Sequence, residues 1–192
     1  VTGVQTCALP ICSRLIRKPG KRYKRPLSEN GWIIEKMLIT HSHFDHIGAV
    51  QTIHENMNIP YCAHKNATEY LKNSQFNLSQ FFCGYDMVLT GAKYLEEGQI
   101  IALDANPKHC LQVIHTPGHT QDSIIFYDEN NNLAFVGDTI FKDMHGRTDF
   151  PGGNLHQLKE SIKTKILTLP DETILYSAHT GPTTVGAEKK YY

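Results

Sequence analysis

The amino-acid sequence predicts a mixed α/β domain, and three observations support this fold class. Apolar runs typical of strands alternate with segments whose apolar residues have helical spacing. Two strand-like runs, 123–128 and 133–136, flank the turn Glu129-Asn130-Asn131-Asn132, which predicts a hairpin and therefore a mixed sheet. Histidine and aspartate residues directly follow several predicted strands, as expected if one edge of a sheet carries a site.

The first half of the chain predicts two strands and two or three helices. Residues 33–40 form an apolar run that predicts a buried strand, and 59–63 predict a second, short strand. Between them, 47–56 have apolar residues at helical spacing. Residues 64–82 predict one or two polar helices. The residues expected to face inward from that segment are Ala67, Tyr70 and Leu71.

The second half predicts strands around one long helix. Residues 99–103 and 111–115 are strand-like and precede the hairpin. Residues 155–167 have an amphipathic helical pattern, and Asn154 is expected to be its N-cap because an asparagine side chain can accept a hydrogen bond from the first turn. Residues 173–176 predict a last strand.

Composition excludes several classes of protein. Of the 192 residues, 40% are hydrophobic and 20% charged, which is too apolar for a disordered chain. Apolar runs stay well below the roughly 18 residues that a membrane-spanning helix needs, so an integral membrane protein is not expected. Five cysteines, an odd number without paired spacing, predict no disulfide framework.

The first 27 residues differ from the rest of the chain. They contain seven basic residues and no acidic one, so the remaining sequence is net acidic and predicts neither a nucleic-acid nor a membrane partner. Val1–Ile11 resembles the translation of a sequencing-adapter oligonucleotide. We therefore interpret 1–27 as an artefactual or frame-shifted segment and 28–192 as one folded domain. The thiols of that domain are unpaired and suit a cytoplasmic protein: Cys62, Cys83 and Cys110.

The strongest functional signal is the heptapeptide Thr40-His41-Ser42-His43-Phe44-Asp45-His46. A single histidine is more often a surface or core residue than a ligand. Three imidazoles and a carboxylate within six residues at the end of a strand are difficult to explain as core, and this set of groups favours a cation. The motif predicts a metal site.

Three further residues also follow predicted strands. His119 lies in Thr116-Pro117-Gly118-His119-Thr120, Asp138 follows Val136-Gly137, and His179 precedes Thr180-Gly181-Pro182. Each has a neighbouring glycine or proline, as is typical of loop-borne ligands. Taken together, these residues are expected to join the heptapeptide in one pocket.

The ordered pattern H-x-H-x-D-H, then His, Asp and His, resembles the metallo-β-lactamase superfamily of αββα sandwiches. Residues 146–153, Gly-Arg-Thr-Asp-Phe-Pro-Gly-Gly, resemble a loop of single-domain hydrolases of the glyoxalase II type. The resemblance covers the chain from about residue 33 onward. The family's first N-terminal strands are expected to be missing or scrambled. Ala178 stands where a glycine is usual before the last histidine.

The resemblance implies a site with two divalent metal ions. His41, His43 and His119 would hold one, Asp45, His46 and His179 the other, and Asp138 would bridge both. Zinc is expected, with iron or manganese as alternatives. A metal-bound hydroxide would then attack a carbonyl, because zinc lowers the pKa of bound water from about 15.7 to about 7.

The favoured substrate is a small-molecule thioester of the S-2-hydroxyacylglutathione type. A thiolate has a pKa near 8.5 and leaves without a strong acid. Asp45 is expected to orient the hydroxide or to protonate a poorer leaving group. Arg147 is expected to contact a substrate carboxylate, with an ion pair to Asp143 or Asp149 as the alternative.

Three other hypotheses remain open at the level of sequence. A mononuclear iron persulfide dioxygenase and a lactonase or β-lactamase would share the fold. An inactive truncated fragment is the non-enzymatic hypothesis, because loss of the first strands would expose a sheet edge and make the chain as written fold poorly.

Overall fold

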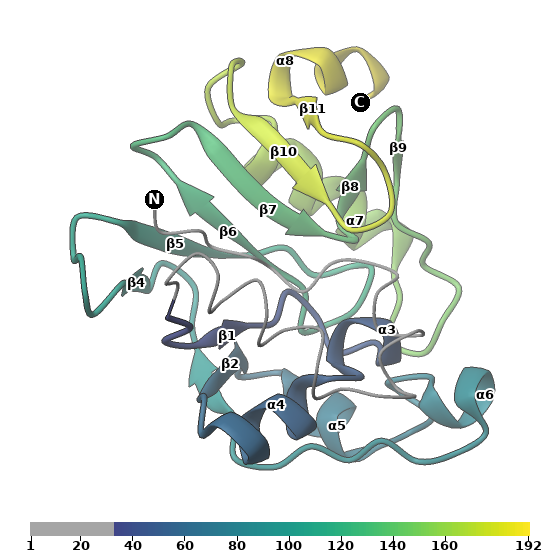
Figure 1. The fold of residues 1–192 in the computed structure, drawn as a ribbon. Helices are drawn as coiled ribbons and strands as arrows, with labels where there is room; N and C mark the ends of the chain where they lie inside the picture. The colour runs from purple at the N-terminus through teal and green to yellow at the C-terminus, as the bar shows by residue number, and fades with distance from the viewer. Residues whose placement is uncertain (1–32) are drawn as a thin grey trace.

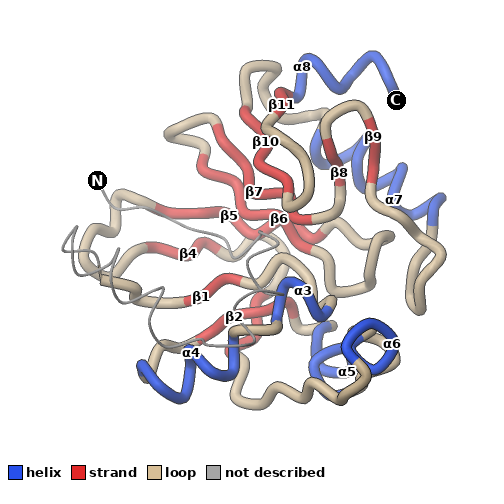
Figure 2. The backbone as a smooth tube through the Cα atoms, turned by 45° about the vertical axis from the view of Figure 1, so that its right-hand side comes forward, coloured by secondary structure: helices blue, strands red, loops and turns tan. Residues whose placement is uncertain are grey.

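The computed structural model describes residues 33–192. The interpretation of 1–27 as artefactual and the expected loss of the first strands concern residues outside this range. The described chain forms two β-sheets that pack face to face, with helices on their outer sides (Figures 1 and 2). This arrangement is the αββα sandwich that the sequence predicted.

The first sheet contains three parallel strands in the order β1-β2-β3. The strands are β1 (Met37–Leu38), β2 (Tyr61–His64) and β3 (Lys93–Leu95). Short helices connect them on one side of the sheet (Figure 1). These helices are α3 (Phe44–Ile47), α4 (Val50–Met57), α5 (Ala67–Lys72) and α6 (Ser79–Cys83).

The second sheet contains six strands in the order β11-β10-β7-β6-β5-β4. Its neighbouring strands are antiparallel except for β10 and β7, which run parallel, so the sheet is mixed as predicted. The strands are β4 (Ile100–Ala102), β5 (Cys110–His115), β6 (Ile124–Asp128), β7 (Leu133–Gly137), β10 (Ile174–Ser177) and β11 (Thr183–Thr184). A separate hairpin is formed by β8 (Ile140–Phe141) and β9 (Met144–His145).

The long predicted helix covers the outer face of the second sheet. It begins as α7 (Leu155–Ser161) and continues as a π-helix, Ile162–Ile166. Oδ1 of Asn154 accepts a hydrogen bond from the backbone N–H of Gln157 at 3.0 Å, which confirms the predicted N-cap. The chain ends in α8 (Val185–Glu188) and a 3₁₀ turn, Lys189–Tyr191.

Three hydrophobic clusters fill the interfaces between the four layers. Leu158, Ile162 and Ile166 pack against the second sheet, while a different cluster around Ile47, Val50 and Leu71 lies between the helices and the first sheet. A third cluster fills the space between the sheets: Cys62, Leu95, Leu111, Val113, Ile124 and Phe126. Within residues 33–192, helices are all too short or too polar to cross a membrane.

The observed elements differ from the predicted ones mainly at their ends. The strand predicted over 33–40 is reduced to β1. Ile33 is 88% exposed and lies outside the core, whereas Ile39 and Thr40 are buried but already belong to the loop that leads to the ligands. The predicted 64–82 segment forms two helices, and Ala67, Tyr70 and Leu71 are buried as expected. The hairpin of β6 and β7 is confirmed by the pairing of Asp128 with Leu133.

Candidate metal centre

The seven predicted ligands come from four loops that meet at one edge of the sandwich. The heptapeptide follows β1 and begins α3, and the other three residues follow β5, β7 and β10. The donor atoms form three groups whose members all lie within 4.8 Å of one another. These groups are His41, His43 and His119; His41, His46 and Asp138; and Asp45, His46 and His179.

Three buried imidazoles form one side of the cluster. Nε2 of His119 lies 3.0 Å from Nδ1 of His43. The centroid of the His41 ring lies 4.9 Å from that of His43 and 4.8 Å from that of His119. All three side chains are almost completely buried. These are the three residues that the family resemblance implied would hold one metal ion.

Asp138 occupies the centre of the cluster. Its Oδ1 lies 3.4 Å from Nε2 of His46, and its Oδ2 lies 3.3 Å from Nε2 of His179 and 3.8 Å from Nε2 of His119. The carboxylate therefore contacts both halves of the proposed ligand set. This position fits the predicted bridging role.

Asp45 and His179 form the more open side. Oδ2 of Asp45 lies 3.3 Å from Nε2 of His179 and 3.7 Å from Nε2 of His46. The side chain of His179 is 42% exposed and that of Asp45 is 32% exposed, whereas the other five ligands are buried. A substrate would therefore reach the cluster from this side.

Several buried polar atoms of the cluster have no hydrogen-bond partner. They are Nε2 of His41, His43 and His46, and Oδ1 of Asp138. Leaving a buried polar atom unpaired costs roughly 1–3 kcal/mol, so four such atoms in one place would be unfavourable without a ligand. A divalent cation would satisfy them, because neutral imidazole nitrogens and carboxylate oxygens are its usual ligands. The donor set thus fits the metal ions that the sequence predicted.

Burial keeps three imidazoles in the neutral form that binds metals. It lowers the pKa of His41 well below its usual value and lowers that of His43 to about 3, with neighbouring histidines adding to both effects. Burial also lowers the pKa of His119, although Asp138 acts in the opposite direction. These side chains need not lose a proton before they bind a cation.

The carboxylates affect the other two histidines differently. Hydrogen bonds to Asp138 and Asp45 raise the pKa of His179 to about 10. Burial lowers the pKa of His46, but the interaction with Asp138 outweighs it and the net shift is upward. Burial opposes ionisation of Asp138, but the close imidazoles of His179 and His46 outweigh burial and shift the pKa of Asp138 downward. The carboxylate is therefore ionised at neutral pH.

Two contacts outside the ligand set orient it, and sequence reasoning missed both. Nδ1 of His119 donates a hydrogen bond to the backbone carbonyl of Arg147 at 2.7 Å, which directs Nε2 toward the cluster. Ser42, between two of the histidines, donates to Oδ2 of the buried Asp122 at 2.7 Å. A backbone carbonyl leaves no signature in a sequence, whereas Asp122 was visible as a carboxylate three residues after His119.

Two glycines allow the loops to approach closely. Gly137 has φ +52°, and a Cβ there would lie 2.6 Å from Oγ1 of Thr40. A Cβ on Gly146 would lie 1.9 Å from the backbone oxygen of Asp138. Any side chain at these positions would displace a loop that carries ligands.

Arg147 is placed at the surface near the cluster. Its Nε and Nη2 donate to the two carboxylate oxygens of Asp149 at 2.7 Å and 2.6 Å, so the ion pair considered as an alternative is present. Its guanidinium carbon also lies 3.9 Å from the centroid of the Phe150 ring. The role of Arg147 in binding substrate stays a prediction.

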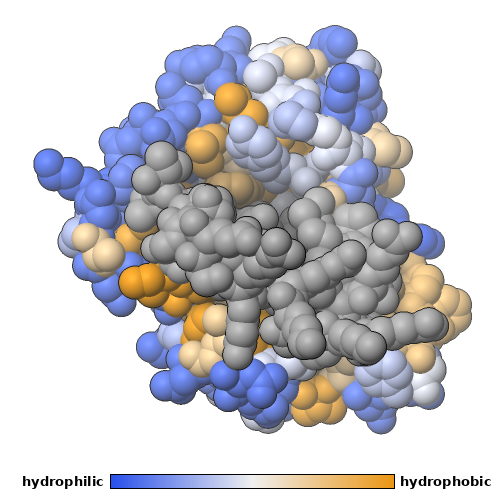
Figure 3. All heavy atoms as spheres, viewed as in Figure 1, coloured by the Kyte–Doolittle hydropathy of each residue, from blue (hydrophilic) through white to orange (hydrophobic). Residues whose placement is uncertain are grey.

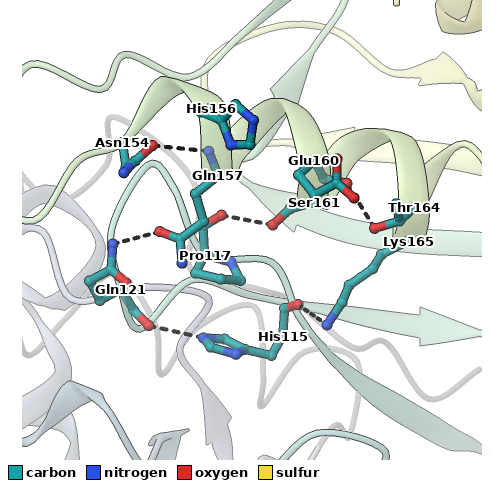
Figure 4. A pocket seen from close by; sticks show the side chains of 10 residues that line it. All are labelled: His115, Pro117, Gln121, Asn154, His156, Gln157, Glu160, Ser161, Thr164 and Lys165. Carbon is teal, nitrogen blue, oxygen red and sulfur yellow. Dashed lines mark hydrogen bonds between the residues drawn. The ribbon is translucent and has the colours of Figure 1, made fainter.

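A groove of about 700 Å³ lies apart from the ligand set (Figure 4). It is lined by α7 and by the loop that contains Gln121, and Nε2 of His115 donates to the carbonyl of Gln121 at 2.9 Å. Lys165 crosses one end and donates to the carbonyl of His115. The seven predicted ligands do not line this groove.

The chain matches one protein family and is similar to two bacterial proteins. Residues 19–179 match the family model described as the metallo-beta-lactamase superfamily. The chain is 37% identical to the probable metallo-hydrolase YqgX of Bacillus subtilis, over 86% of this chain and 77% of that protein. It is 33% identical to the hydroxyacylglutathione hydrolase GloC of Haemophilus influenzae, over 82% of this chain and 74% of that protein.

Three crystal structures are also similar. The BLEG-1 B3 metallo-beta-lactamase has a TM-score of 0.79 and 32% identity, with 87% of this chain and 79% of that chain covered. TTHA1623 in a di-iron-bound form has a TM-score of 0.75 and 31% identity, with 88% and 81% covered. ETHE1 from Myxococcus xanthus has a TM-score of 0.72 and 25% identity, with 99% and 75% covered.

Proposed function

The chain belongs to the metallo-beta-lactamase superfamily and is a metal-dependent hydrolase, and from this premise we propose that it cleaves thioesters of the S-2-hydroxyacylglutathione type. The observation that carries the proposal is the convergence of seven nitrogen and oxygen donors from four loops. The similarity to GloC supports the choice of substrate.

The proposed ligand assignment follows the geometry of the cluster. The three neutral imidazoles would hold one ion, and Asp45, His46 and His179 would hold the second. Asp138 would contact both, because its two oxygens face His46 on one side and His119 and His179 on the other. Zinc is the proposed metal, and the di-iron form of TTHA1623 keeps iron as an alternative.

Two bound divalent ions would supply an acidic water molecule and polarise the substrate carbonyl. The protein's own groups perform the remaining tasks. Asp45 lies on the open side, and in this proposal it would accept a hydrogen bond from the attacking water and so orient that water toward the carbonyl carbon. The hydrogen bond from Nδ1 of His119 to the carbonyl of Arg147 would orient Nε2 toward the metal before substrate binds.

The leaving group determines how much further help is needed. A thiolate has a pKa near 8.5 and departs without protonation by a strong acid. The cluster offers carboxylates that are ionised or paired with histidines, which suits a thioester better than an amide. We also propose that Arg147 binds a substrate carboxylate, which would have to compete with Asp149 for the guanidinium.

The test combines elemental analysis with turnover of S-lactoylglutathione. Two metal ions per chain and thioester hydrolysis are expected. One iron per chain, with oxygen uptake on glutathione persulfide, would instead establish a dioxygenase.

The similarity to BLEG-1 favours a β-lactamase or a lactonase as a second candidate. A chromogenic cephalosporin and a simple lactone are the appropriate substrates for this test. Hydrolysis of either one, without hydrolysis of S-lactoylglutathione, would reject the thioesterase proposal in favour of this candidate.

A further inference from the structure

A short helix with exposed phenylalanines lies beside the candidate metal centre. It is α6, and the buried Asn77, two residues before its first residue, fixes its position. Nδ2 of Asn77 donates to the backbone carbonyls of Tyr70 and Met87, both at 2.9 Å. The backbone carbonyl of Asn77 accepts from the N–H of Phe44 at 2.8 Å, at the start of the helix that carries Asp45 and His46. The helix and the metal ligands are therefore held in a fixed relative position.

Three aromatic rings, which we call the aromatic row, lead from the ligands to the surface. Phe150 packs edge-on against His43 with 5.9 Å between ring centroids, Phe82 packs against Phe150 at 5.9 Å, and Phe81 packs against Phe82 at 4.9 Å. Phe82 also stacks on Phe44 at 5.0 Å. The row thus begins at a proposed metal ligand and continues outward through Phe150, Phe82 and Phe81.

The outer part of the row is unusually exposed. Phe81 is 78% exposed and Phe82 is 49% exposed. In Figure 3, apolar side chains reach the surface at the right-hand edge, close to the position of α6 in Figure 1. Exposed apolar surface of this kind marks a binding site more often than chance, and its continuity with the ligands points to the substrate as its occupant.

We propose that the aromatic row binds the acyl side chain of the substrate and selects 2-hydroxyacyl groups that carry an aryl or long alkyl substituent. This inference rests on the proposed thioesterase function and specifies the acyl group. A lactoyl group has only a methyl substituent, which offers the row far less apolar surface than a phenyl or a long alkyl chain. A phenyl substituent can contact Phe150 next to His43, and a longer chain can continue to Phe82.

The first test compares S-mandeloylglutathione with S-lactoylglutathione, which differ by a phenyl in place of a methyl. In the wild-type enzyme, kcat/KM is expected to be at least about 10-fold higher for the mandeloyl compound, the scale of selection that an apolar pocket provides. Phe150→Ala and Phe82→Ala should lower this ratio severalfold, and Phe81→Ala should lower the ratio measured with a longer 2-hydroxyacyl chain. Tyr85→Ala is the matched control, because Tyr85 is an exposed aromatic residue near α6 outside the row.

A binding measurement separates this inference from the proposed reaction. Calorimetry of the metal-loaded protein with the unreactive thioethers S-benzylglutathione and S-methylglutathione should show tighter binding of the benzyl compound, and Phe150→Ala should remove the difference. If neither thioester is hydrolysed but this difference appears, the thioesterase proposal fails while the apolar subsite remains.

Equal or absent binding of the two thioethers would overturn the role of the row. So would a wild-type kcat/KM ratio near one. Light scattering supplies a third check: if Phe81→Ala and Phe82→Ala convert a dimer into a monomer and leave the substrate ratio unchanged, the row is a contact between copies of the chain and the inference is wrong.

Discussion

Asp138 is the residue whose removal should affect the site most. It is the only carboxylate in the cluster that lies close to His46, His119 and His179 together. Asp138→Asn is expected to lower metal content below two ions per chain. It should also reduce kcat/KM by about 100-fold or more. Substitution of residues that only hydrogen-bond to a metal ligand already lowers metal affinity or activity by about 10–100-fold.

Elemental analysis and thioester turnover measure both effects of Asp138→Asn. Asp104→Asn is the matched control, since Asp104 is exposed and its ion pair is with Lys36, outside the proposed site. An Asp138→Asn protein with full metal content and normal turnover would contradict the bridging role.

His64 provides a pH-dependent contribution to stability outside the metal centre. Burial, together with the stacked ring of His115 at 3.9 Å, lowers the pKa of His64 to about 4, and its Nδ1 accepts a hydrogen bond from the N–H of Asn66. In the unfolded chain a histidine binds its proton near pH 6.5. Because the unfolded state then binds more protons than the folded state, the free energy of unfolding should fall as pH decreases from about 6.5 to about 4.

Urea unfolding of the metal-free protein at pH 7 and pH 5 measures this contribution. The loss of stability between the two pH values should be smaller in His64→Asn than in the wild type, because asparagine does not titrate. The same loss in both proteins would contradict this contribution, because it would mean that His64 has the same pKa in the folded and unfolded states.

At the scale of single elements, the N-cap of α7 is a defined contribution to stability. Asn154→Ala removes the side-chain oxygen that accepts from Gln157 and is expected to lower the free energy of unfolding by about 1 kcal/mol. Asn154→Asp keeps an acceptor and should remain close to wild type. Equilibrium denaturation distinguishes these outcomes, and equal stability of all three proteins would show that the cap is irrelevant.

The loop around Gly146 should tolerate no side chain. Gly146→Ala would bring a Cβ to 1.9 Å from the backbone oxygen of Asp138, so the loop must move and the metal content should fall. Gly181→Ala is the control, because a Cβ there has no neighbour within 4 Å. Normal metal binding by Gly146→Ala would mean that the ligands can follow the loop without loss.

Elements with dense apolar patterns could be predicted from the sequence, and elements at the edges could not. All five residues of β6 are buried, and its run of apolar residues was sufficient to identify it. Strand β3 was not predicted. Two of its three residues are exposed, so it lacks an apolar run, and its pairing with β2 depends on the tertiary structure. The predicted ligands were visible because the chemistry requires particular side chains, whereas the carbonyl of Arg147 could come from any residue.

For the whole molecule, metal binding should couple to folding. The ligands are far apart in the sequence, and an unfolded chain cannot bring them together. A metal that binds only the folded state stabilises it by about 2.7 kcal/mol when the free concentration is 100 times the Kd. Thermal unfolding should therefore occur at higher temperature after zinc is added to metal-free protein, and an unchanged midpoint would argue against the proposed site.

The ligands lie on loops that follow strands of both sheets, and this arrangement affects how long the protein persists in the cell. One ion would connect the loop after β1 in the first sheet to loops of the second, so it acts as a crosslink between two halves of the chain. A molecule without bound metal would lack that crosslink, would unfold more often and would therefore be degraded faster by proteases. The amount of this enzyme should therefore follow the supply of metal even when its synthesis is constant.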